Sequence, residues 1–340
     1  MRVLVTGAAG FIGGYVVREL LARGYDVTGL DNFSKYGRVT RAYFADPRYQ
    51  HVAGDARDVD LVRRLAFEAD HIIAGAAMIG GISYFHACPY DLIAANEQII
   101  ASTCDAAIAA LRAGRLRKVT YVSSSMVYES ATSWPSVEGD EHRIPPPWSA
   151  YGFQKLAVEY FARAAGEQHM LPYTIVRPFN AVGIGEQRAL GTVEVMSGNI
   201  KLAMSHVVPD LVAKVLKGQD PLHIFGDGTQ VRHFTYGGDL ARGIVAAMEH
   251  PAAEGEDFNL STAVSTTVLE LAGKIWAKIK GPHEPLRWVS DPPFKHDVQC
   301  RIPATGKARR ILGFHAATSL DDALDEVIPW VEQALEEGVI

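Results

Sequence analysis

A tyrosine and a lysine four positions apart, Tyr151 and Lys155, form the pair of residues with the clearest chemical potential. On a helix, such side chains point the same way, so the phenol and the ammonium would lie together. Free tyrosine titrates near pH ~10, and lowering its pKa by ~3 units takes roughly 4 kcal/mol of stabilisation of the phenolate. A lysine one turn away, helped by a cationic cofactor ring, is a source of that stabilisation. The pair therefore predicts a proton shuttle, although an ordinary amphipathic helix can show the same spacing.

A glycine-rich turn near the amino terminus is the second chemical feature, with Gly7, Gly10 and Gly13 at every third position. Gly7 would permit a tight turn, Gly10 a close approach of the backbone to a pyrophosphate, and Gly13 close packing of a helix on a strand. The amino terminus of that helix would then face the diphosphate. The turn predicts a dinucleotide-binding site.

An acidic residue at the end of the next predicted strand, Asp31, selects among dinucleotides. Its carboxylate can accept hydrogen bonds from both hydroxyls of a ribose and would repel a 2′-phosphate, which favours NAD over NADP. Lys35 and Arg38 follow closely and leave NADP open as an alternative.

These residues need a scaffold, and the first 180 residues alternate short β-rich runs with helical patterns. The predicted strands are Arg2–Thr6, Asp26–Asp31, Tyr49–Gly54, His71–Gly75, Lys118–Ser123 and Thr174–Arg177. The predicted helices between them are Gly13–Arg23, Asp58–Glu68, Tyr90–Ala113 and Tyr151–Gln168. Such alternation predicts an α/β fold with a Rossmann-type doubly wound parallel sheet, covered on both faces.

The pattern loosens after Asn180, and we predict an NAD-binding domain over 1–182 and, over 183–340, mainly a smaller mixed α/β substrate domain. Residues 233–262 are expected to pack back onto the first domain, with Phe258–Ser261 as a further strand. Residues 183–205 lack periodicity and predict a mobile loop near a site. Pro209–Lys217 is a predicted helix, Leu222–Phe225 a strand, and a closing helix begins near Leu320.

The bulk composition narrows the class of protein. The 340 residues are 48% hydrophobic and 21% charged, as in a soluble globular enzyme. A net charge of −6 argues against a nucleic-acid or membrane partner recruited by a global basic field. No apolar run approaches the ~20 residues that span a bilayer, and the amino terminus has no signal-peptide pattern. Cys88, Cys104 and Cys300 match no metal-ligand spacing, so we expect a cytoplasmic protein without a metal.

Together these motifs resemble the extended short-chain dehydrogenase/reductase family, the nucleotide-sugar epimerases and dehydratases. The resemblance covers nearly the whole chain. Beyond the features above, it rests on the segments Gly54–Asp58, Ala76-Ala77, Asn96, Ser123–Tyr128, Arg177–Asn180, His206–Pro209, Phe225–Thr229, Arg232–Tyr236 and Gly306–Ala308. It implies a tightly held NAD across the carboxyl ends of the strands and a nucleotide diphosphate sugar in the smaller domain.

The resemblance also implies roles for single residues. Tyr151 would take or return the proton of a sugar hydroxyl, Lys155 would hold the nicotinamide ribose and lower the pKa of the tyrosine, and Ser124 would hydrogen-bond the same hydroxyl. The residues expected at NAD are Gly7, Gly10, Phe11, Ile12, Gly13, Asp31, Asn32, Asp55, Ala56, Ala76, Ala77, Asn96 and Lys155. Those expected at the nucleotide sugar are Ser124, Met126, Asn180, His206, Val207, Phe225, Arg232, Gly81 and Arg301.

Departures from the family pattern bear on the reaction. Sugar 4,6-dehydratases of the family carry Asp-Glu where this chain has Ser125 and Met126, and methionine cannot act as an acid or a base. The segment Met78–Phe85 is similar to a loop of GDP-mannose 3,5-epimerases, but those enzymes carry a cysteine acid or base where this chain has Met126. UDP-glucuronate decarboxylases tend to carry a glutamate just after the catalytic threonine, and this chain has none there. Ser124, Tyr151, Lys155 and NAD remain, which favours a 4-epimerase that works through a transient 4-keto sugar.

Several alternatives stay open at this point. They are a 3,5-epimerase, dehydratase or decarboxylase of the same family, a net NAD(P)-dependent sugar reductase, and a redox-sensing regulator without activity. Retention of the tyrosine, lysine and serine argues against the regulator. The resemblance further implies a homodimer, formed through the helices around 91–112 and 151–168.

Overall fold

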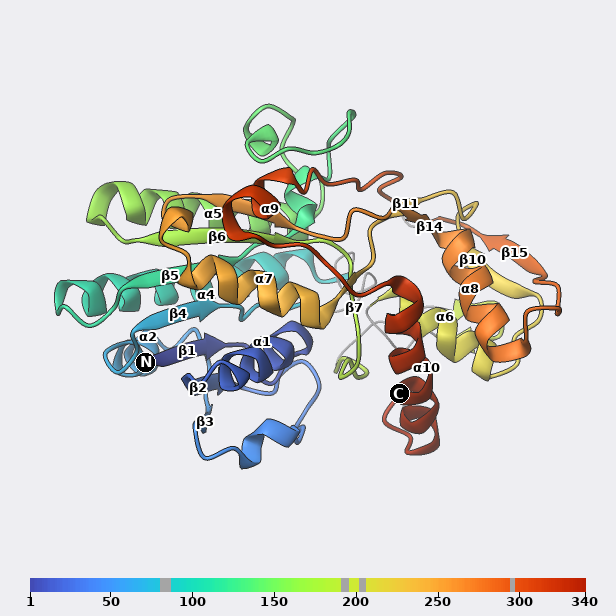
Figure 1. Ribbon diagram of the computed structural model, residues 1–340, viewed down its shortest axis with the longest axis horizontal. Helices are drawn as coiled ribbons and strands as arrows, with labels where there is room; N and C mark the ends of the chain where they lie inside the picture. The colour runs from blue at the N-terminus through green and yellow to red at the C-terminus, as the bar shows by residue number, and fades with distance from the viewer. Residues whose placement is uncertain (80–86, 191–195, 202–205, 294–296) are drawn as a thin grey trace.

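Seven parallel strands form the central sheet of the protein, a computed structural model that describes residues 1–79, 87–190, 196–201, 206–293 and 297–340 (Figure 1). The strands are β1 (Arg2–Thr6), β2 (Asp26–Asp31), β3 (Tyr49–Ala53), β4 (His71–Ala74), β5 (Lys118–Val122), β6 (Tyr173–Pro178) and β13 (Asp257–Leu260). Their order in the sheet is β13-β6-β5-β4-β1-β2-β3. The order reverses between β1 and β4, the point at which doubly wound sheets bind their ligands. The predicted α/β Rossmann-type fold is confirmed.

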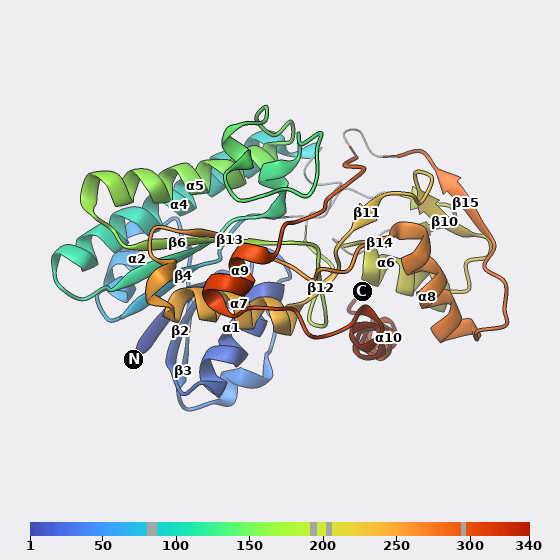
Figure 2. The same ribbon diagram turned by 45° about the horizontal axis from the view of Figure 1, so that its top comes forward.

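Helices cover both faces of this sheet (Figures 1 and 2). The helices α1 (Phe11–Ala22) and α7 (Gly237–Glu249) pack on one face, and α2 (Val59–Ala66), α4 (Pro89–Arg112) and α5 (Ala150–His169) pack on the other. Successive side chains of a strand point to opposite faces. Val3 and Val5 of β1 accordingly enter the core below α1, whereas Leu4 enters the core below α4 and α5. Burial on both faces explains why the strands read as continuous apolar runs.

A smaller part of the molecule lies beyond the carboxyl ends of the strands, at the right of Figure 1. Its core is formed by α6 (Val207–Leu216), α8 (Val268–Lys280) and α10 (Leu320–Glu336), packed around the parallel pair β10 (Leu222–Phe225) and β15 (Trp288–Asp291). Two short antiparallel pairs complete it: β11 (Val231–Arg232) with β14 (Thr266–Thr267), and β8 (Met196–Ser197) with β9 (Ile200–Lys201). The parallel pair β7 (Ala181–Val182) and β12 (Thr235–Tyr236) lies where the two parts join.

Two details differ from the sequence expectations. Residues 196–201 form the β8–β9 hairpin inside the segment that was predicted to be a loop, because Ser197 is anchored by Asp291 and Gln219 of the smaller part. The helix α9 (Gly306–Leu312) packs with α7 and β13, so the chain returns to the large sheet a second time after β13.

The described residues contain no helix long and apolar enough to cross a membrane. Over the same ranges, no group of three or more histidine, cysteine or acidic side chains is arranged to hold a metal ion.

Candidate active site

A single cavity of about 520 Å³ runs along the carboxyl ends of β1, β2, β4, β5 and β6 and continues between the sheet and the smaller part. It brings together most of the residues selected from the sequence. Those that line it are Gly7, Gly10, Phe11, Ile12, Gly13, Asp31, Asn32, Asp55, Ala56, Ala76, Ala77, Ser124, Met126, Tyr151, Lys155, Asn180, His206, Val207, Phe225, Arg232 and Arg301. The predicted substrate residue Gly81 lies outside the described residues.

The glycine turn forms a tight cradle at the start of α1. Gly7 has φ +75°, a conformation that side chains disfavour, and its N–H donates to the carbonyl of Leu30 at 2.8 Å. A Cβ on Gly13 would lie 2.0 Å from the carbonyl oxygen of Gly7. Gly10 caps α1 without a side-chain hydrogen bond, so the first N–H groups of the helix face the cavity as an anion site.

The carboxylate of Asp31 stands beside this cradle. One oxygen accepts from the N–H of Ala9 at 3.0 Å and the other from the N–H of Phe33 at 2.8 Å. Each carboxylate oxygen keeps a further lone pair for a ribose hydroxyl. The close-packed cradle and the oriented acid together fit the diphosphate and ribose of NAD.

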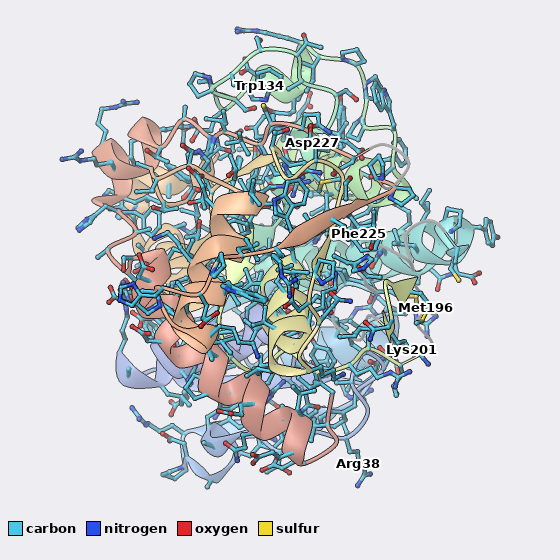
Figure 3. The ribbon with its side chains drawn as sticks, turned by 90° about the vertical axis from the view of Figure 1, so that its right-hand side faces the viewer. Arg38, Trp134, Met196, Lys201, Phe225 and Asp227 are labelled. Carbon is cyan, nitrogen blue, oxygen red and sulfur yellow. The ribbon has the colours of Figure 1, made fainter. Side chains whose placement is uncertain are left out.

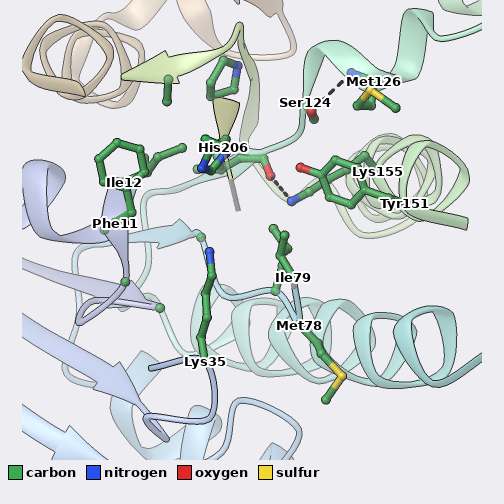
Figure 4. A pocket seen from close by; sticks show the side chains of 18 of the residues that line it. Phe11, Ile12, Lys35, Met78, Ile79, Ser124, Met126, Tyr151, Lys155 and His206 are labelled. Carbon is green, nitrogen blue, oxygen red and sulfur yellow. Dashed lines mark hydrogen bonds between the residues drawn. The ribbon is translucent and has the colours of Figure 1, made fainter. Parts of the chain in front are cut away.

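The two basic residues that left NADP open occupy different places. Lys35 points into the cavity, where burial lowers its pKa and the charge of Glu186 partly offsets that effect (Figure 4). Arg38 is exposed and projects from the lower edge of the molecule (Figure 3). Arg38 therefore does not contact the cavity.

Two predicted cofactor residues are held by other groups of the chain. Asn96 does not line the cavity: its Oδ1 accepts from the N–H of Met78 at 2.7 Å and its Nδ2 donates to the carbonyl of Met78 at 3.0 Å. It therefore shapes the segment after β4. Asp55 lines the cavity, but its carboxylate is held by Arg57 at 2.7 Å, which lowers its pKa to about 2.

The proposed catalytic side chains converge at the start of α5 (Figure 4). Ser149 caps this helix by accepting from the N–H of Gly152 at 3.0 Å, which places Tyr151 in its first turn. Lys155 lies one turn further along and donates from Nζ to the carbonyl of Val122 at 2.9 Å. Ser124, directly beyond β5, hydrogen-bonds with the side chain of Tyr151. The serine, phenol and ammonium therefore share one wall of the cavity.

The electrostatics around the tyrosine are dominated by burial. Burial raises the pKa of Tyr151, and the hydrogen bond with Ser124 and the charge of Arg301 only partly offset this. The ammonium of Lys155 is bonded to the Val122 carbonyl, and burial lowers the pKa of Lys155 to about 8. That Lys155 lowers the pKa of Tyr151 when NAD is bound stays a prediction.

A buried ionic network supports this wall from below. Arg177 is 0% exposed and donates to both oxygens of Glu159, at 2.7 and 2.6 Å, and to Glu141 at 2.8 Å. Burial alone would lower the pKa of Arg177, but Glu159 above all raises it well beyond its usual value. Ser123 donates to the same carboxylate of Glu159 at 2.6 Å. The network ties α5 to the strand ends that carry Ser124.

The far end of the cavity holds the predicted substrate residues. Arg232 donates from NH1 to the carbonyl of Val231 at 3.0 Å and from NH2 to Asp297 at 3.3 Å, so its guanidinium is already paired. The ring of Phe225 lies 5.3 Å from the ammonium of Lys214. Phe225 lies on the face of the smaller part that is turned toward the viewer in Figure 3.

His206 links this end to the cofactor cradle. Its Nδ1 lies 2.8 Å from the carboxylate of Glu186, and its ring lies 5.9 Å from the ring of Phe11. His233, next to Arg232, is buried and does not line the cavity: its Nδ1 lies 2.9 Å from the carbonyl oxygen of Thr262.

Several polar residues of the cavity were not expected from the sequence. Glu129, Ser149, Asp210, Lys214, Gln230 and Asp297 all line it. Glu129 is the most consequential, because it places a carboxylate near the catalytic wall: its Oε2 accepts from the N–H of Ser149 at 2.8 Å. Its position could have been predicted from the sequence, because Glu129 follows Ser124 by five residues and the turn after a strand stays at the same edge of the sheet.

Comparisons with known proteins now decide the family. The NAD dependent epimerase/dehydratase family matches residues 3–261. The chain belongs to this family. A UDP-glucose 4-epimerase of Mycolicibacterium smegmatis is 30% identical over 332 residues, which are 96% of this chain and 97% of that protein. NAD is therefore the cofactor for which the cradle and Asp31 are built.

Solved structures of family members superpose closely on this one. The UDP-glucose 4-epimerase of Thermotoga maritima with UDP-glucose has a TM-score of 0.81 and 26% identity, covering 98% of this chain and all of that one. The DesIV double mutant, a dTDP-glucose 4,6-dehydratase of Streptomyces venezuelae with NAD bound, has a TM-score of 0.83 and 27% identity, covering 100% of both chains. Epimerases and dehydratases thus share this architecture, and the fold alone does not choose between them.

Proposed function

We propose that the chain is an NAD-dependent nucleotide-sugar epimerase that inverts C4 of its sugar. The observation that carries this proposal is the composition of the catalytic wall. Ser124, Tyr151 and Lys155 stand together beside the NAD cradle, while positions 125 and 126 are a buried serine and a methionine. The pair of acids that a 4,6-dehydratase uses at those two positions is missing.

The chain's own residues have defined tasks in this reaction. NAD, when bound, takes up and returns the hydride. Tyr151 removes the proton of the C4 hydroxyl and returns it after the sugar has turned, since its phenol is the acid or base on the wall. Ser124 bonds the same hydroxyl and orients it. Lys155 stands one turn away, where its ammonium can bind the ribose and stabilise the phenolate as it forms.

Glu129 favours a second candidate function. Its carboxylate lines the same cavity, and its Oε2 is held by the N–H of Ser149, two residues before the catalytic tyrosine. A carboxylate there can act as an acid for a leaving hydroxyl or as a base toward a ring proton. The second candidate is therefore a dehydratase in which Glu129 replaces the acids missing from positions 125 and 126.

The two candidates are separated by the mass of the product. The purified protein is denatured and assayed for released NAD, and the native protein is incubated with UDP-, GDP-, ADP- and TDP-sugars without added cofactor. The proposal expects bound NAD and the formation of an epimer of unchanged mass. Loss of water or carbon dioxide would overturn it in favour of a lyase, and a requirement for equimolar NAD(P)H would overturn it in favour of a reductase.

We also propose a homodimer formed through α4 and α5, which lie side by side on one face of the sheet (Figure 2). Tyr90 at the start of α4 is 80% exposed, and Phe153 and Tyr160 on α5 are 47% and 57% exposed. Light scattering on the eluted protein should give twice the chain mass, and a single-chain mass would refute the dimer. The cytoplasmic location stays a prediction.

A further inference from the structure

Two side chains of the cavity, Arg301 and Asn180, keep hydrogen-bond donors without an acceptor among the described residues. NH1 of Arg301 donates to Oδ1 of Asn180 at 3.1 Å, the one hydrogen bond that this guanidinium makes among the described residues. Because a guanidinium only donates, the amide must turn its oxygen toward Arg301 and its Nδ2 away. This Nδ2 is buried and has no acceptor within the described part of the chain. Buried donors of this kind usually have a partner, so they indicate a ligand.

The backbone around Arg301 is fixed from two sides. Val231 of β11 donates to the carbonyl of residue 299 at 2.8 Å and accepts from the N–H of residue 301 at 3.1 Å. Ser136, from the large domain, makes the same exchange with residues 302 and 304, both at 2.8 Å. Residues 299–304 thus bridge the two parts of the molecule, and the guanidinium projects from a segment held in one position.

No carboxylate among the described residues forms an ion pair with Arg301. Burial above all, and then the charge of the neighbouring Arg232, lower the pKa of Arg301 to about 9. Glu129 and Asp297 act in the opposite direction, but neither forms an ion pair with Arg301 in the described residues. Asp297 is paired with Arg232, and Glu129 accepts from Ser149. An anion beside Arg301 would therefore relieve an electrostatic cost of the folded protein.

The charge of Arg301 reaches both the catalytic wall and the end of the cavity that holds Arg232, because it acts on Tyr151 and on Arg232. The positive charge of Arg301 acts on Tyr151, the residue that marks the reacting carbon. Arg232, by contrast, is bonded to Asp297, and the same carboxylate accepts from Gln230 of the smaller part. The donors of Arg301 and Asn180 thus stand where the sugar ring lies, provided that the proposed function is right about Tyr151.

We infer that Arg301 and Asn180 bind a carboxylate carried by the sugar, so that the preferred substrate is a nucleoside diphosphate uronic acid. The planar guanidinium matches the two oxygens of a carboxylate, and the amide Nδ2 supplies a third donor. A neutral hexose would leave the guanidinium without a counter-ion.

The test measures binding without turnover. Calorimetry on Tyr151→Phe protein compares UDP, UDP-glucose and UDP-glucuronate, with and without Arg301→Gln. Arg310→Gln, an exposed arginine of α9, is the matched control. A charge-assisted contact predicts that UDP-glucuronate binds ~10- to 100-fold more tightly than UDP-glucose. Arg301→Gln should remove that preference and leave the affinity for UDP unchanged, and Arg310→Gln should change neither.

Three outcomes would overturn the inference: equal affinity for the two sugars, failure of both to bind, or a loss of UDP affinity in Arg301→Gln equal to the loss for UDP-glucuronate. The last would assign Arg301 to the diphosphate. Failure of the proposed function gives a different result from failure of this inference. If the protein makes no epimer but still prefers UDP-glucuronate through Arg301, the proposed function fails and this inference stands. Epimerisation of UDP-glucose with equal affinity for both sugars would instead refute this inference alone.

Discussion

Replacing Gly13 by alanine should disrupt the NAD cradle while leaving the rest of the fold in place. The new Cβ would lie 2.0 Å from the carbonyl oxygen of Gly7 and 2.9 Å from its carbonyl carbon. Reaching an ordinary contact of 3.4 Å requires a shift of 3.4 − 2.0 = 1.4 Å between α1 and the turn. Both partners are backbone, so no side chain can move aside. Overpacking of this kind costs about 1–3 kcal/mol.

The neighbouring Gly14 provides a matched control in the same helix. Its new Cβ would meet the nearest atom, the hydroxyl of Tyr43, at 3.5 Å, which is an ordinary contact. Alanine there should be neutral or stabilising by up to about 1 kcal/mol, because glycine is a poor helix former.

The assay is the NAD content of purified protein together with its melting temperature. Gly13→Ala should lose at least about tenfold in NAD affinity, equivalent to about 1.4 kcal/mol, and should melt a few degrees lower. Gly14→Ala should retain NAD and melt at or above the temperature of the parent. Full NAD occupancy and an unchanged melting temperature in Gly13→Ala would refute the assignment of the cradle.

Further predictions follow from the catalytic wall and the network below it. Tyr151→Phe should abolish epimerisation in a product assay while released NAD stays at the parent level; appreciable turnover would remove Tyr151 from its role. Because burial lowers the pKa of Lys155 to about 8, its ammonium is lost as pH rises through that value, and kcat should fall there. A profile that stays flat to pH ~10, the usual range of lysine, would contradict this. Glu159→Gln breaks the buried pair with Arg177 and should destabilise the fold by about 3–5 kcal/mol in denaturant titrations. Glu167→Gln, at an exposed position of the same helix, should have almost no effect, and equal stabilities of the two variants would refute the account of the network. His71 is buried and its pKa is lowered to about 4, so its contribution to stability is complete above pH ~6.5 and lost as pH falls toward 4. In His71→Gln, the loss of stability over that range should be smaller, and an unchanged acid profile would count against this role.

Much of the large domain could be predicted because its signals are local. The strands Arg2–Thr6, Asp26–Asp31 and Leu222–Phe225 were placed with the observed ends, since apolar β-rich runs stop where turn residues begin. The helix that carries Tyr151 and Lys155 begins at Ala150, as the cap residue Ser149 favours. The glycine turn and Asp31 could be assigned from spacing alone because their chemistry depends on the backbone path between adjacent elements.

The side-chain positions and pKa values that the sequence did not predict depend on contacts between distant segments of the chain. Lys118 was expected at the start of a strand, but its burial and its hydrogen bond to the carbonyl of Ala247 at 2.8 Å, far away in the sequence, were not. Asn96 has the family's residue type, but the fold turns it toward Met78 and away from the cavity. The pKa of Tyr151 depends on burial, and the Lys155 ammonium is bonded to the carbonyl of Val122; the spacing of the two residues predicts neither.

The most direct test of the central claim follows the hydrogen at C4. Protein without added cofactor is given UDP-glucose and UDP-glucuronate labelled with deuterium at C4, and the products are analysed by NMR and mass spectrometry. If C4 is inverted by hydride transfer, a C4 epimer should form with the deuterium retained at C4, and no carbon of the sugar should take up hydrogen from solvent. Loss of the label to solvent, or incorporation of solvent hydrogen at C3 or C5, would contradict it.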